Sequence, residues 1–73
     1  MKNTSTDFLK NLGKNVQKLR TQKGLEIEEL SKLLGINISY LKKIEEGFAK
    51  GIKLSHLEKF TSGLGVNLKN LLE

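Results

Sequence analysis

Apolar side chains recur every three or four residues along most of the chain, which is the spacing of one buried helix face. A first helix is predicted over residues 6–23, with inward positions at Leu9, Leu12, Val16 and Leu19. Gly13 lies within this helix and should weaken it by about 1 kcal/mol relative to alanine. Gly24 follows the last periodic positions and is placed to end the helix.

The same spacing predicts two short helices in the middle of the chain. One covers residues 27–34 and ends at Gly35, with inward positions at Leu30, Leu33 and Leu34. The other covers residues 38–46, begins after Asn37 and ends at Gly47, with Leu41 and Ile44 facing the core. Asparagine is a strong N-cap because its side-chain oxygen accepts a hydrogen bond from a free backbone N–H of the first turn.

The C-terminal part of the chain predicts one longer helix and one short one. The longer helix covers residues 54–64, ends at Gly65 and buries Leu54, Leu57, Phe60 and Leu64. Asn67 can cap the short helix, which carries Leu68, Leu71 and Leu72. No segment alternates apolar and polar residues with a period of two, so no strand is expected. The predicted fold is therefore an all-α, compact five-helix bundle.

The length of 73 residues is enough for one domain with one core. We expect residues 1–11 to form an N-terminal extension that merges into the first helix, and residues 12–73 to form the folded domain. No apolar run approaches the roughly 20 residues of a membrane span. The N-terminus also lacks the apolar stretch of a signal peptide. The chain is therefore expected in the cytoplasm, without membrane contact.

The charge of the chain favours a polyanionic partner. Thirteen lysine and arginine residues stand against eight aspartate and glutamate residues, which gives a formal net charge of +5. On a small domain this balance favours nucleic acid first and acidic lipid second. The excess is uneven, because residues 26–46 contain three lysines and five glutamates and are net acidic.

The sequence contains no set of residues that indicates an enzyme active site. His56 is the only histidine and lies outside the two central helices, so we expect it on the surface. Cysteine is absent, which excludes disulfides and thiolate metal sites. Glu26, Glu28 and Glu29 are better explained by a helix start that complements the helix dipole than by an acid–base pair. We therefore expect no catalytic residue, metal, cofactor or small-molecule substrate.

The two central helices are separated by Gly35, Ile36 and Asn37. A short turn that contains glycine can cross two helices at a steep angle, as in a helix-turn-helix. Gly35 can take a positive φ in this turn, while Ile36 can fill the core beneath it. In this arrangement the second helix of the pair, residues 38–46, enters the major groove of DNA.

The residues on both sides of this turn resemble the lambda-repressor/Cro-type helix-turn-helix family, also called XRE. The resemblance covers residues 12–72 and is carried by the ordered segments 16–20, 24–25, 29–31, 34–37, 40–47 and 64–67, and by Leu71. It implies a lambda repressor-like DNA-binding domain. It also implies that Arg20, the only arginine in the chain, forms a structural ion pair with Glu45. An arginine fork can pair with both oxygens of a carboxylate.

The resemblance also implies which residues meet DNA bases. The family's base-reading positions fall on Asn37, Ile38, Ser39 and Lys42 or Lys43. If Leu41 and Ile44 face inward, the outward side carries Ile38, Ser39, Lys42, Lys43 and Glu46. Lysine can donate to guanine, serine can serve several bases, and isoleucine can contact the methyl group of thymine.

Contacts with DNA phosphates are expected from the loop that follows residues 38–46. Lys50 and Lys53 lie in this loop, and the resemblance places Lys53 close to the DNA backbone. Ile27 stands where relatives carry a glutamine that touches phosphate, and Glu26 beside it would repel one. These departures from the family pattern predict weaker or unusually tuned DNA binding.

The sequence favours a transcriptional repressor that binds a palindromic DNA operator as a homodimer, with Leu68, Leu72 and Phe48 as apolar contacts between the two copies. The alternative is a protein-interaction module, antitoxin-like or regulatory, which keeps the fold while Ile27 and Ile38 form a partner surface. Small relatives include phage repressors, restriction–modification controllers and antitoxins, and the sequence does not choose among them.

Overall fold

The computed structural model describes the backbone of residues 4–72 and the side chains of residues 7–72. Helices and connecting turns make up this described part, and it contains no strand. The helices are α1 (Thr4–Gln22), α2 (Ile27–Leu34), α3 (Ile38–Glu46), α4 (Leu54–Leu64) and α5 (Leu68–Leu72). The all-α, five-helix prediction is confirmed, with small shifts only at the two ends of α1.

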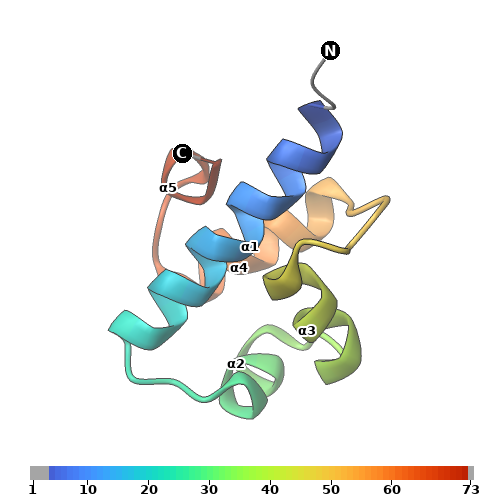
Figure 1. Cartoon of the computed structure of the whole chain (residues 1–73). Coiled ribbons are helices and arrows are strands. Elements are labelled where there is room, and N and C mark those ends of the chain that lie inside the picture. The colour runs from blue at the N-terminus through green and yellow to red at the C-terminus, as the bar shows by residue number, and fades with distance from the viewer. Residues whose placement is uncertain (1–3, 73) are drawn as a thin grey trace.

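Helix α1 is the central support of the domain. It packs most closely against α3 and α5 and touches α4, while α2 packs against α3 and α4. Figure 1 shows α2 and α3 together below α1, with α5 on its other side. The helix pair that the sequence assigns to DNA is therefore gathered at one end of the domain.

Every described helix contributes buried side chains to one hydrophobic core. Its buried side chains are Leu12, Val16, Leu30, Leu34, Ile36, Leu41, Ile44, Ala49, Leu57, Phe60, Leu64 and Leu71. Leu9 and Leu19, which the sequence also places inward, are half-buried at the margin. Removal of this apolar surface from water is the main favourable contribution to folding.

Two leucines that the sequence places in the core are exposed. Leu33 is 55% exposed and Leu54 is 62% exposed. On α2 the buried face is set by Leu30 and Leu34, and Leu33 is turned about 100° from Leu34 around the helix. Leu54 is the first residue of α4 and stands beside the face formed by Leu57, Phe60 and Leu64.

The turn between α2 and α3 is held from both sides. Gly35 has a φ of 68° and ends α2, and Ile36 is 5% exposed and fills the core beneath the turn. The hydroxyl of Ser31 donates a hydrogen bond to the carbonyl of Ile36 at 2.6 Å. Lys59 Nζ, from α4, donates to the carbonyl of Gly35 at 3.5 Å. These contacts restrict the angle at which α3 leaves α2.

Candidate nucleic-acid interface

Helix α3 is closed at both ends by its own caps. The side-chain oxygen of Asn37 accepts hydrogen bonds from the backbone N–H groups of Ser39, at 2.8 Å, and Tyr40, at 3.3 Å. Gly47 ends the helix with a φ of 85°. Because Asn37 uses its oxygen for capping, its amide Nδ2 is the side-chain group left to meet a DNA base.

Arg20 ties α1 to the last turn of α3. Its Nε donates to Glu45 Oε2 at 2.7 Å, and its Nη2 donates to Glu45 Oε1 at 3.1 Å. Its Nη1 donates to the carbonyl of Leu25 at 2.8 Å, in the segment that leads into α2. The Arg20 and Glu45 side chains are 13% and 7% exposed. We call this three-way contact the Arg20–Glu45 clasp.

The clasp does not depend on pH in the neutral range. The hydrogen bond to Glu45 raises the pKa of the Arg20 guanidinium above its ordinary value; burial opposes this rise, and the charges of Glu45 and Glu26 add to it. A cationic group with a raised pKa in the folded state contributes stability below its unfolded pKa. The Arg20 contribution is lost as the pH rises through its folded pKa, which for arginine lies in strong alkali.

The side of α3 that faces away from the core carries a polar stripe. Its members are exposed and follow the spacing of one helix face, at Ser39, Lys42, Lys43 and Glu46. We call this set the α3 stripe. Ile38 lies at the start of the helix and is half-buried. The structure therefore brings together three of the base-reading candidates, with Asn37 and Ile38 next to them at the helix start.

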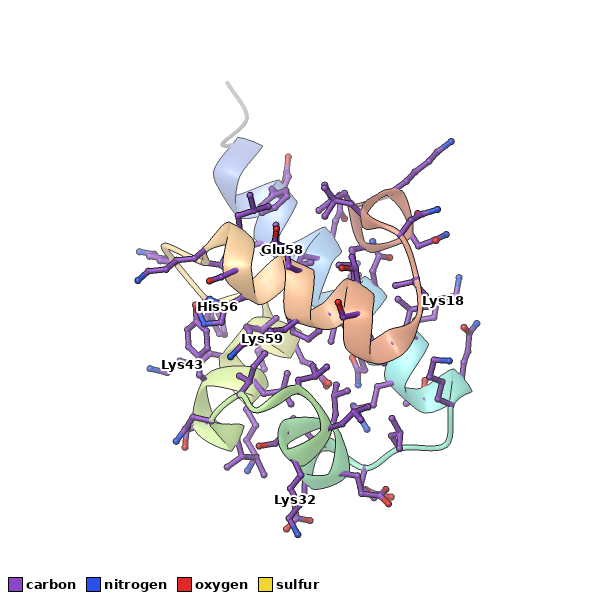
Figure 2. The ribbon with its side chains drawn as sticks, turned by 180° about the vertical axis from the view of Figure 1, so that it is seen from behind. Lys18, Lys32, Lys43, His56, Glu58 and Lys59 are labelled. Atoms are coloured by element: carbon purple, nitrogen blue, oxygen red, sulfur yellow. The ribbon has the colours of Figure 1, made fainter. Side chains whose placement is uncertain are left out.

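Further cations follow α3 along the chain. Lys50 and Lys53 are exposed in the segment between α3 and α4. Lys53 is the N-cap residue of α4 but makes no side-chain capping hydrogen bond. Figure 2 shows Lys43 projecting outward from α3 and Lys59 placed on α4. Positive charge is therefore available both on α3 and on the segments that follow it.

Ile27 does not contribute its side chain to this surface. It is half-buried and packs against the core, where an apolar side chain offers nothing to a phosphate. Carboxylates occupy the start of α2: Glu28 and Glu29 lie in its first turn, and the backbone N–H of Glu26 donates to Glu29 Oε1 at 2.8 Å. The phosphate contact at Ile27 stays a prediction, and only the backbone N–H at this start of α2 could make it.

The three residues expected at a dimer contact do not lie together. Leu68 is 41% exposed and Leu72 is half-buried, both on α5. Phe48 is 68% exposed and directly follows α3. Figures 1 and 2 place α5 and the segment between α3 and α4 at opposite flanks of the domain. Phe48 therefore lies apart from Leu68 and Leu72 on this copy, and a dimer contact through these residues stays a prediction.

Two supporting contacts have no counterpart in the sequence analysis. The ring of His56, on α4, lies 5.1 Å from the ring of Tyr40, on α3, measured between centroids. The sequence predicts a surface position for His56, but the residue is half-buried and its Nδ1 is buried without a hydrogen-bond partner. The side-chain amide of Asn15 donates to the carbonyl of Leu71 at 2.6 Å and ties α1 to α5. Such pairs join remote segments, so no periodic pattern indicates them.

The described part of the chain was also compared with the requirements of a membrane-spanning helix and of a metal site. Its helices are all too short or too polar to cross a membrane. Its histidine, aspartate and glutamate side chains form no group of three that could hold a metal ion. The α3 stripe and the lysines that follow it are therefore the surface with the clearest chemistry.

Solved structures of bacterial proteins have the same fold. The restriction–modification controller protein C.AhdI from Aeromonas hydrophila matches with a TM-score of 0.79 and 32% identity, over 86% of this chain and 94% of that one. A hypothetical transcription factor, NHTF, from Neisseria matches with a TM-score of 0.84 and 32% identity, over 94% and 78%. An HTH_3 family transcriptional regulator from Vibrio cholerae, with a TM-score of 0.83, is 24% identical over 92% and 37% and supports the fold alone.

The family comparison matches most of the chain. No curated protein sequence matches it significantly, but the family model HTH_3, described as helix-turn-helix, matches residues 16–71. The match includes the turn after α2, both residues of the Arg20–Glu45 clasp and the whole α3 stripe. The chain therefore belongs to the HTH_3 family of helix-turn-helix DNA-binding domains, the XRE or Cro/C1 type with a lambda repressor-like fold.

Proposed function

We propose that the chain is a sequence-specific regulator of transcription that binds double-stranded DNA in the cytoplasm and acts as a repressor. The α3 stripe carries this proposal, because it presents Ser39, Lys42 and Lys43 on one exposed side of a helix that is capped at both ends. The likeness to a controller protein and to a hypothetical transcription factor supports it. Residues 12–73 form the DNA-binding unit in this proposal, and residues 1–11 extend it.

In the proposed complex, α3 lies in the major groove. Lys42 and Lys43 donate hydrogen bonds to guanine O6 and N7, and the Ser39 hydroxyl bonds to a base edge. Ile38 contacts a thymine methyl group from the start of the helix, and Asn37 donates through its free amide nitrogen. Because the caps and the Arg20–Glu45 clasp already hold α3, little of its order has to be gained on binding.

Lys50 and Lys53 hold the DNA backbone in this proposal. Both are exposed in the segment that follows α3 along the chain, and a phosphate contact fixes the register of a domain without reading sequence. The carboxylates at the start of α2 take no part in phosphate binding. The backbone is therefore held mainly from the side of α3 that leads into α4.

Substitutions on α3 and in the segment after it should affect DNA binding differently. Lys43→Ala or Ser39→Ala should change which operator variants are preferred and cost about 1–3 kcal/mol on the best site, because base edges are reached from the helix in the groove. Lys53→Ala should weaken binding to all duplexes by similar factors and lower the slope of log affinity against log salt by about one unit. Selection from a random duplex library, followed by titrations, measures both effects. Equal loss from all three variants on every duplex would contradict sequence reading by α3.

We also propose that the regulator is a homodimer on a palindromic operator, joined through α5. A two-fold axis at α5 would pair the exposed side of Leu68 and part of Leu72 with the same residues of a second copy. The symmetry would then set two α3 helices about 34 Å apart, one turn of DNA. The predicted contact of Phe48 would lie outside this α5 contact, because Phe48 is on a different flank of its own copy.

Leu68→Asp should weaken this dimer by at least about tenfold, because an aspartate at a closed contact loses its hydration without gaining a partner. Sedimentation equilibrium measures the effect. Lys32→Ala, at an exposed position on α2, is the control and should leave the dimer unchanged. A wild-type chain that stays monomeric at high micromolar concentration, with and without DNA, would rule out the α5 dimer.

A further inference from the structure

The outward side of α1 carries a row of lysines. Lys10, Lys14 and Lys18 are exposed and stand four residues apart, and each step of four residues advances about 6 Å along a helix. Lys14 is turned about 200° from the buried Leu12 around the helix, so the row lies opposite the core. We call these residues the α1 lysine row. Like charges four residues apart destabilise a helix, so the reason for the row must lie in binding and not in folding.

The charge of the row is not neutralised within the described part of the chain. Lys10, Lys14 and Lys18 have no hydrogen-bond or ion-pair partner among the residues that the structure describes. Asp7 is the only acidic residue in the sequence of α1, and it lies in the first turn, ahead of the row. The positive charge of the α1 lysine row is therefore available to a ligand.

A polar hollow adjoins the last lysine of the row, between α1 and α5. Its volume is about 340 Å³, and it is lined by Asn15, Lys18, Leu19, Gln22 and Asn70. The side-chain oxygen of Asn70 accepts a hydrogen bond from the backbone N–H of Asn67, which leaves its amide nitrogen free to donate. Lysine, asparagine and glutamine side chains are among the groups that bind phosphate oxygens in protein–DNA complexes. The hollow can therefore receive a phosphate group beside Lys18.

The composition of this surface distinguishes between kinds of anionic partner. Between residues 10 and 22 the other exposed side chains are polar and uncharged: Asn11, Gln17, Thr21 and Gln22. A single strand needs aromatic rings on which its bases stack, and a membrane surface needs apolar side chains that insert into it. Protein interfaces are depleted in lysine. The backbone of duplex DNA needs only cations and hydrogen-bond donors, and it is therefore the partner that this surface fits.

We propose that the α1 lysine row and the hollow beside it bind the backbone of a second DNA duplex, so that one domain bridges two duplexes. Figure 2 shows Lys18 and Lys43 projecting from opposite flanks of the domain, so a duplex held by α3 leaves Lys18 free. The second duplex needs no particular sequence, because phosphate contacts carry no sequence information. This inference goes beyond the proposed function, since the second duplex lies outside the contact made by α3.

The double variant Lys14→Gln/Lys18→Gln tests this inference in the full chain. Lys10 is left intact, because its Cγ lies close to Gly47 at the end of α3. A duplex with the selected operator is immobilised, saturated with protein and offered a labelled duplex of unrelated sequence. The double variant should retain at least about tenfold less of the second duplex than the wild type, with operator affinity changed by less than about twofold. The salt slope of this capture should fall by about 1.8, because each phosphate contact contributes about 0.9.

Lys18→Gln and Lys32→Gln form a matched pair of single variants, because each removes the charge of one exposed lysine. Figure 2 shows Lys32 on α2, away from Lys18, so only Lys18→Gln should reduce capture of the second duplex. Capture by the double variant equal to that of the wild type would overturn the inference. Equal losses for the operator and the second duplex would also overturn it, since the row would then touch the duplex that α3 reads.

Failure of the proposed function gives a different result. If the wild-type chain enriches no operator, α3 does not read sequence, and the row is tested by titration of a single random duplex. The double variant must still lower the salt slope by about 1.8, and an unchanged slope would overturn the inference. A wild-type chain that binds vesicles of phosphatidylserine but retains no second duplex would assign the row to acidic lipid and overturn it as well.

Discussion

Gly13→Ala should destabilise the fold by about 3 kcal/mol, although glycine-to-alanine changes inside helices are normally stabilising. A Cβ atom at residue 13 would lie against the carbonyl oxygen of Ile44 and 2.6 Å from the carbonyl oxygen of Glu45. Both obstacles are backbone atoms at the end of α3, so no side-chain rotation relieves the clash. Helices α1 and α3 would have to separate, which would also strain the Arg20–Glu45 clasp.

Urea denaturation at 25 °C measures this effect. Lys14→Ala is the matched control, because Lys14 is the next residue on α1 and is exposed, and a surface change of this kind stays within about 0.5 kcal/mol. We also expect Gly13→Ala to lose DNA affinity, since it displaces the helix that carries the α3 stripe. A Gly13→Ala protein as stable as the wild type would mean that α1 and α3 do not approach as closely as described.

Arg20→Ala should also cost about 3 kcal/mol of folding stability. Glu45 would keep a carboxylate that is 7% exposed and would have no cation to compensate its charge. The Leu25 carbonyl would lose its donor as well. A domain of this size has about 5–15 kcal/mol of stability in total, so a substantial part of it would disappear.

Two further variants separate the charge from its geometry. Arg20→Lys keeps the charge but cannot bind both carboxylate oxygens and the Leu25 carbonyl together, so its stability should lie between those of Arg20→Ala and the wild type. Adding Glu45→Gln to Arg20→Ala removes the uncompensated charge and should recover part of the loss. If the melting temperature of Arg20→Ala hardly moves, the pair behaves as a solvated surface contact and does not hold α3 in place.

The helices could be predicted because apolar spacing and the residues that end each helix agree with the final fold. Apolar residues repeat at helical spacing, and Gly35 and Gly47 end α2 and α3 where positive φ angles are required. The outward side of α3 followed from Leu41 and Ile44, since the burial of two positions on a short helix determines the direction of the others.

The remaining features depend on contacts between distant segments. Helix propensity predicts that Gly13→Ala stabilises the protein, which is the opposite of the effect expected here. Glycine is needed at this position because the backbone carbonyl groups of α3 leave no room for a Cβ atom. No periodic pattern indicates that the Ser31 hydroxyl donates a hydrogen bond to the turn that follows α2. His56 shows no pattern that reveals its contact with Tyr40. Leu33 was misplaced because a hydrophobic side chain beside the buried stripe has the same spacing as one within it.

The most direct test of DNA binding by this domain is the salt dependence of its affinity for duplex DNA. We predict that log affinity falls linearly with log salt, with a slope of about −0.9 for each phosphate contacted, and that a selected operator binds more tightly than a scrambled duplex at every salt concentration. An affinity for DNA that is absent or insensitive to salt, in a chain that instead binds a protein partner and loses that partner on Ile38→Asp, would contradict the proposed function and favour an interaction module.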